Sequence, residues 1–136
     1  MKETFYERIG EAVCRERLTN GLEVCVVPKP GYAKKYAFFS TRYGGMDTRF
    51  CLDGQWLNTP AGIAHYLEHK LFENEDCDAF ERYARTGASA NAYTSFSQTA
   101  YLFTCTERVE ESLEILLDFV QKPYFTPETV AKEQGI

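Results

Sequence analysis

The sequence predicts an α+β fold, in which an antiparallel or mixed sheet carries helices on one face. Three observations support this class. A tight-turn hairpin signal opens the chain, helical segments are grouped in its middle, and a second pair of strands precedes an amphipathic helix. Turn-linked strands with grouped helices are typical of one sheet covered by a helical layer. With 136 residues, positions 1–136 are expected to form a single domain.

Turn residues and apolar runs define the expected strands. Asn20-Gly21 lies between two apolar runs, which predicts a hairpin. Gly44-Gly45 ends the third strand, and residues 46–58 are expected to form an irregular polar loop. The expected strands span residues 12–17, 22–28, 35–41, 88–94 and 99–105.

Capping residues and helical periodicity define the expected helices. Thr59 and Pro60 suit the start of a helix over 61–72, and Gly87 is expected to end a second helix over 77–85. Thr106 is the expected cap of a third helix, and Thr126 with Pro127 starts a fourth. The predicted core stripe of the third helix is Val109, Leu113, Leu116, Leu117 and Val120.

Composition excludes several function classes. The net charge is −5 and no basic cluster occurs, so neither nucleic acid nor a membrane surface is an expected partner. The five cysteines are scattered and odd in number, which favours reduced thiols and a cytoplasmic location over a disulfide framework. No signal peptide and no apolar stretch of membrane-spanning length is seen.

The two histidines of the chain, His65 and His69, enclose Glu68 in an H-x-x-E-H pattern. Positions i and i+4 of a helix share a face, so both imidazoles can bind one metal ion. Glu68 follows His65 by three residues and can take a proton from a metal-bound water. Two surface histidines beside a solvated glutamate are the alternative. Catalytic zinc also requires a third protein ligand, which this pattern does not contain.

Longer segments of the chain resemble a known family. Residues 59–73 resemble the active-site helix of the pitrilysin/insulinase family of inverzincin zinc metallopeptidases, in its bacterial YmfH-like branch. Residues 87–94 resemble the active-site edge strand of that family. Further similar segments are residues 19–22, 43–45, 117–119 and 126–136. The implied fold is the N-terminal part of a mitochondrial-processing-peptidase-like metallohydrolase domain.

The resemblance implies roles for individual residues. His65 and His69 would be zinc ligands, and Glu68 would be the base that activates water. The strand residues Ala90, Asn91 and Ala92 would line the cleft and pair with an extended peptide. For Asn91 the alternative is a strand-edge residue that bonds its own backbone.

The third zinc ligand of the family would fall outside this sequence. In the family it is a glutamate seven residues after the position of Glu133, which would be position 140. The domain is therefore expected to be truncated. Glu133 itself is expected to orient a histidine from the outer shell or, alternatively, to be a solvated helix glutamate.

The expected function is zinc-dependent endopeptidase or processing-peptidase chemistry on peptides or unfolded polypeptides. The expected protein partners are a second copy of the chain or another family subunit. The alternative function is a non-catalytic polypeptide-binding or assembly module that uses the exposed edge strand.

Overall fold

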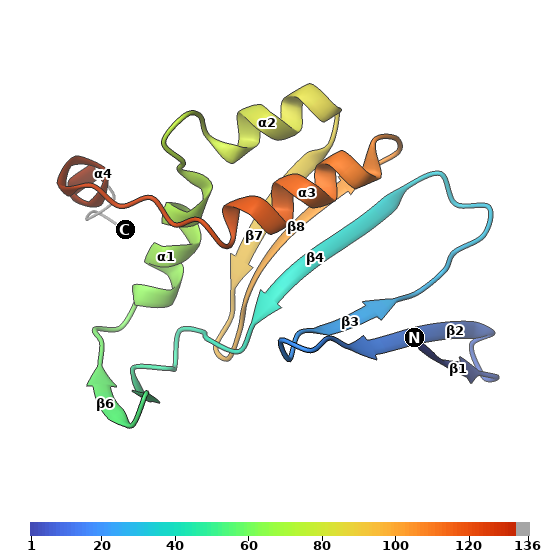
Figure 1. Ribbon diagram of the computed structural model, residues 1–136, viewed down its shortest axis with the longest axis horizontal. Helices are drawn as coiled ribbons and strands as arrows, with labels where there is room; N and C mark the ends of the chain where they lie inside the picture. The colour runs from blue at the N-terminus through green and yellow to red at the C-terminus, as the bar shows by residue number, and fades with distance from the viewer. Residues whose placement is uncertain (133–136) are drawn as a thin grey trace. The chain divides into compact units, whose positions relative to one another are not determined.

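The computed structural model describes residues 1–132 (Figure 1). By contacts, the chain divides into two compact units, of which the first spans Met1–Ala33 and the second starts at Lys34. The single-domain expectation for residues 1–136 stays a prediction.

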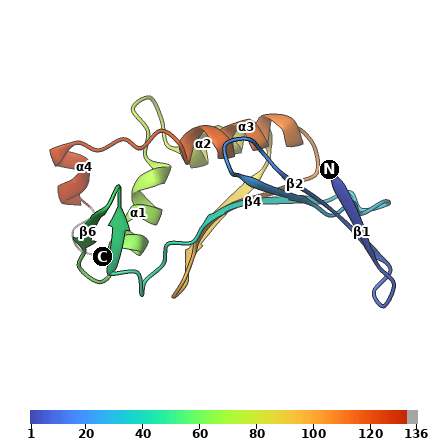
Figure 2. The ribbon, with the colours of Figure 1, turned by 60° about the horizontal axis from the view of Figure 1, so that its bottom comes forward.

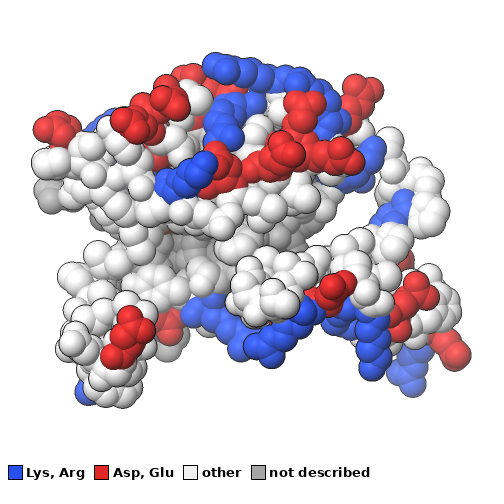
Figure 3. All heavy atoms as spheres, in the orientation of Figure 1, with Lys and Arg blue, Asp and Glu red and all other residues white. Residues whose placement is uncertain are grey.

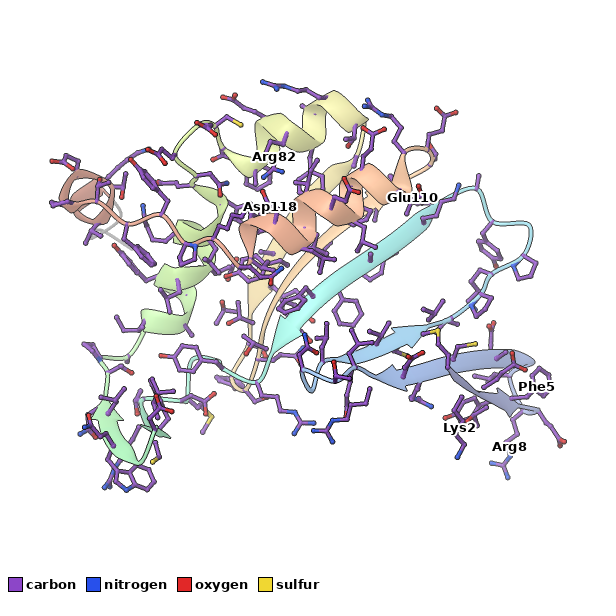
Figure 4. All side chains as sticks on the ribbon, viewed as in Figure 1. Lys2, Phe5, Arg8, Arg82, Glu110 and Asp118 are labelled. Carbon is purple, nitrogen blue, oxygen red and sulfur yellow. The ribbon has the colours of Figure 1, made fainter. Side chains whose placement is uncertain are left out.

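The first unit is a three-stranded antiparallel sheet in the order β1-β2-β3. Its strands are β1 (Lys2–Tyr6), β2 (Glu11–Arg17) and β3 (Glu23–Val26). The predicted hairpin between β2 and β3 is confirmed: Gly21 has a φ of 88°, and the Leu22 amide donates to Asn20 Oδ1 over 3.1 Å. Strand β1 was not predicted. All five of its residues are exposed, including Lys2 and Phe5 in Figure 4, so it has no alternating pattern to reveal it.

The second unit is built on the antiparallel sheet β4-β8-β7. Its strands are β4 (Lys35–Thr41), β7 (Ser89–Thr94) and β8 (Thr99–Cys105). Helices α2 (Ala79–Thr86) and α3 (Val109–Phe119) cover one face of this sheet (Figures 1 and 2). The buried core between them is largely aromatic and includes Phe72, Tyr83, Tyr101, Phe103, Leu116 and Phe119. The predicted α+β class, with helices on one sheet face, is confirmed.

The segment between β4 and the motif helix is not the irregular loop that was expected. It forms a hairpin of β5 (Arg49–Leu52) and β6 (Gln55–Asn58). Asp53 and Gly54 make its two-residue turn with φ of 49° and 80°, as a type I′ turn requires. The Arg49 guanidinium lies 4.8 Å from the centre of the Trp56 ring, which adds a cation–π contact across the two strands.

Two of the predicted helix caps are wrong. Helix α1 (Ile63–Phe72) starts after Gly62, which has a φ of 93°. The amide of Thr59 instead donates to the Thr48 carbonyl over 2.8 Å, so Thr59 closes the hairpin segment and not the helix. Helix α3 starts after Arg108, not after Thr106, and Arg108 has no side-chain capping bond.

Two other helix ends follow the prediction. Gly87 ends α2 with a φ of 75°. In α4 (Pro127–Lys132), Thr126 caps the start, because its Oγ1 accepts from the Thr129 amide over 3.2 Å.

The core face of α3 is turned from the predicted stripe. Leu113 and Leu117 are 40% and 36% exposed, while Ser112, Ile115 and Phe119 are buried. The buried Ser112 hydroxyl is satisfied, since it donates to Thr86 Oγ1 over 3.1 Å. A hydrogen-bonded serine therefore lies on the core face of α3, where the apolar pattern predicted leucines.

Acidic and basic side chains are interspersed over α2 and α3 on the face shown in Figure 3. Arg82 of α2 and Asp118 of α3 form an ion pair of 2.8 Å between the two helices (Figure 4). Within residues 1–132, no helix is long and apolar enough to cross a membrane.

Candidate metal and peptide site

Helix α1 brings the two histidines together on its exposed side. The Nε2 atoms of His65 and His69 are 3.2 Å apart, and the ring planes are inclined by 80°. Two Zn–N bonds of ~2.0–2.1 Å at a tetrahedral angle separate their nitrogens by about 3.3 Å. The pair therefore has the separation that one zinc ion requires. Residues 1–132 contain no group of three or more histidine, cysteine or acidic side chains that could hold a metal.

Glu68 lies on the inner side of the same helical turn. Its side chain is buried, with 9% exposure, whereas both histidines are exposed. The Thr94 hydroxyl, at the end of β7, donates to Glu68 Oε2 over 2.5 Å. A carboxylate held by a hydrogen bond beside two paired histidines has the arrangement expected of a general base.

A depression of about 300 Å³ opens beside this turn. Glu68 and His69 line it together with Asn91 and Ala92, so the structure brings the motif and two of the predicted strand residues to one place. Ala90 packs instead against the hydrophobic core. The remaining lining residues are Phe72, Glu73, Asp78, Phe80 and Lys132.

Strand β7 is at one end of the sheet order among the described strands, with β8 as its neighbour. The Ala92 amide donates to the side-chain Oδ1 of Asn91 over 2.9 Å. An amide that bonds a side chain of its own strand points away from the ladder with β8. Asn91 thus bonds its own backbone, and the outward edge near the motif carries a main-chain donor.

Side chains of α1 also hold α4. The Tyr66 hydroxyl donates to the Val130 carbonyl over 3.1 Å. Lys70 is fully buried and pairs with Glu73, whose other oxygen lies 3.9 Å from the Lys132 ammonium. Helix α4 is thereby fixed to the helix that carries the histidines. The predicted outer-shell residue Glu133 lies outside the described residues.

Tyr101 packs below the motif helix. Burial, and then the negative charge of Glu68, raise the pKa of its hydroxyl well above the ordinary value. The hydroxyl therefore stays protonated, and it donates to the Leu67 carbonyl over 3.4 Å.

Two residues of this region were not identified from the sequence. Thr94 contacts Glu68 across 26 positions, and Phe80 of α2 stacks on Phe72 with ring centres 4.4 Å apart. Alternation along β7 was the available signal for Thr94, since Ala90, Ala92 and Thr94 are the half-buried positions of that strand. For Phe80, no local sequence pattern distinguishes a residue that lines a pocket from a residue of the core.

Comparisons with known proteins identify the family of this chain. Residues 57–136 match the family model described as Insulinase (Peptidase family M16). The zinc protease YmfH of Bacillus subtilis is 53% identical over 138 residues, which cover 100% of this chain and 32% of that protein. The chain therefore spans about a third of the length of this relative.

Solved structures give the same result. The crystal structure of an M16-like peptidase from Alicyclobacillus acidocaldarius superposes with a TM-score of 0.88 at 47% identity, over 92% of this chain and 30% of that one. Pitrilysin has the same fold, with a TM-score of 0.74 at 21% identity, over 96% of this chain and 14% of that one. The chain accordingly belongs to the insulinase family, peptidase family M16.

Proposed function

We propose that this chain provides the catalytic helix and the peptide-binding strand of a zinc-dependent endopeptidase. One observation carries the proposal. The Nε2 atoms of His65 and His69 are 3.2 Å apart, in the same helical turn as the buried carboxylate of Glu68. The name of the Bacillus relative, a zinc protease, supports zinc as the metal.

In the proposed reaction His65 and His69 hold the metal. Bound zinc supplies a polarised carbonyl and a water of lowered pKa. Glu68 accepts the proton of the attacking water and then returns it to the leaving amine. Because Glu68 is mostly shielded from solvent, its charge acts on the reacting groups with little screening.

The edge of β7 is proposed to bind the substrate as an added strand. A carbonyl of an extended peptide takes the place of Asn91 Oδ1 on the Ala92 amide. Such main-chain pairing needs an extended segment, so the proposed substrates are peptides and unfolded polypeptides. Ala92, which lines the depression, has a small side chain, which lets a peptide backbone approach the strand closely.

A third metal ligand is proposed to be a carboxylate outside the described residues. Glu133 is proposed to orient a histidine from the outer shell. We further propose that residues 1–136 belong to one metallopeptidase domain in the cytoplasm, which pairs with a second copy or another family subunit.

The decisive experiment compares wild type with Glu68→Gln in the protein as its native gene encodes it. Zinc content is expected to be equal in both. The rate of hydrolysis of an unstructured fluorogenic peptide is expected to fall by about 100-fold or more, which is the usual contribution of a general base to the rate. Glu110→Gln is the matched control, because Glu110 is an exposed residue of α3 that points away from the core (Figure 4). Equal hydrolysis by wild type and Glu68→Gln would rule out the proposed base.

A second candidate function is binding of polypeptides without cleavage, favoured by the outward Ala92 amide on β7. In that case peptide binding, measured by fluorescence anisotropy, persists without product formation and is unchanged in a His65→Ala, His69→Ala double variant. Loss of hydrolysis in the double variant, from a hydrolysing wild type, excludes this candidate.

A further inference from the structure

We propose that Thr94 is a positioning residue, which holds one oxygen of the Glu68 carboxylate and leaves the other for the attacking water. The inference rests on the proposed function, in which Glu68 is the general base. Its basis is the 2.5 Å hydrogen bond from Thr94 Oγ1 to Glu68 Oε2, which joins the end of β7 to the middle of α1.

The direction of this bond follows from counting hydrogens. A hydroxyl group has one hydrogen to donate, and a carboxylate only accepts. The hydrogen of Thr99 is used on the Tyr43 carbonyl, over 2.8 Å. Since a carboxylate cannot donate, the 2.5 Å contact with Glu68 takes the one hydrogen of Thr94, and neither hydroxyl has a hydrogen left for the 3.4 Å contact between Thr99 and Thr94. Thr94 is left to donate to Glu68.

Packing fixes the Thr94 side chain in this orientation. Thr94 and Thr99 are partners in the register of β7 and β8, and Thr99 is 3% exposed. A β-branched side chain on a strand has few rotamers. The buried neighbour Thr99 therefore leaves the Thr94 side chain little rotational freedom. Thr94 also shares the half-buried side of β7 with Ala90 and Ala92, the side that faces the motif helix.

The arrangement couples substrate binding to the position of the base. The strand that offers the Ala92 amide to a peptide ends in the hydroxyl that holds Glu68. A peptide bound along β7 is thus placed relative to Glu68 through two residues of one strand. Placement of this kind lowers a barrier because the reacting groups are already oriented.

The kinetic test uses Thr94→Val, which keeps the shape and removes the hydroxyl, and Thr94→Ser, which keeps the hydroxyl. In the natively encoded protein, Thr94→Val is expected to lower kcat by about tenfold, part of the effect of a general base, with KM and zinc content nearly unchanged. Thr94→Ser is expected to stay within about threefold of wild type. Thr104→Val on β8 is the control for the same chemical change. An unchanged kcat in Thr94→Val, or failure of Thr94→Ser to restore it, overturns the proposal.

A second readout needs neither zinc nor activity. Urea unfolding midpoints are measured for Thr94→Val, Glu68→Ala and the double variant. If the two side chains bond each other, Thr94→Val shifts the midpoint less in the Glu68→Ala background than in wild type. Equal shifts in both backgrounds overturn the contact. A protein with this coupling but without peptide hydrolysis contradicts the proposed function and not the contact itself.

Discussion

Replacing Gly44 by alanine is expected to lower the free energy of unfolding of the second unit by about 3–5 kcal/mol. Gly44 is buried where the chain leaving β4 crosses the turn between β7 and β8. A Cβ at this position would lie 2.5 Å from the Gln98 nitrogen, 2.5 Å from the Ser95 oxygen and 2.7 Å from the Phe96 carbonyl carbon. All three atoms belong to the backbone, so no side chain can turn away.

The magnitude follows from the movement that the new methyl group requires. A contact of 2.5 Å is about 1 Å shorter than an optimal carbon contact. A shift of that size breaks two backbone bonds of 2.9 Å, from Gly45 to Ser95 and from Met46 to Phe96. Each contributes about 1 kcal/mol, and the overpacking itself costs about 1–3 kcal/mol.

The assay is urea unfolding followed by far-UV circular dichroism, with Gly45→Ala as the matched control. A Cβ on Gly45 would lie 3.8 Å from the Ser95 oxygen, an ordinary contact, and Gly45 is exposed. The control is expected to change the free energy of unfolding by about 0.5 kcal/mol or less. If the two variants have the same stability within that margin, the steric argument for Gly44 is wrong.

Three further changes are expected to alter stability. The Tyr83 hydroxyl is buried with no hydrogen-bond partner among the described residues, so Tyr83→Phe should raise the free energy of unfolding by about 1 kcal/mol in urea titrations. Lys122 and then Arg82 hold the pKa of Asp118 below its usual range. This contribution is present above the unfolded pKa of about 3.9 and is lost as pH falls through the lower folded value, so Asp118→Asn should cost about 0.5 kcal/mol at pH 7 and progressively less as the pH falls below about 3.9. Phe119→Ala, in the aromatic core, should lower the thermal midpoint through a loss of about 3–5 kcal/mol.

Features set by neighbouring residues could be predicted from the sequence. The turn at Gly21, the end of α2 at Gly87 and the cap at Thr126 depend on contacts within a few positions, and each is found in the structure. The histidine pair belongs to the same class, because helix geometry alone brings His65 and His69 together.

Features set by distant contacts could not be predicted. Thr59 was expected to cap α1, but its amide donates to the Thr48 carbonyl and Thr59 belongs to the hairpin segment instead. The inward place of Ser112 depends on Thr86, and the bond between Thr94 and Glu68 depends on how β7 lies against α1. The hairpin at Asp53-Gly54 is a different case. The Asp-Gly pair is a hairpin turn signal, but the strands beside it are mostly exposed and do not alternate between apolar and polar residues.

The buried ion pair of Lys70 makes that lysine a built-in reporter of the motif helix. Its side chain is 0% exposed and is enclosed with the Glu73 carboxylate at the end of α1. An amine-acylating reagent therefore reaches Lys70 only when the packing around α1 opens, whereas the exposed Lys132 reacts directly. Mass spectrometry of the two acylated lysines would measure, in one native sample, how often the helix that carries the histidines opens.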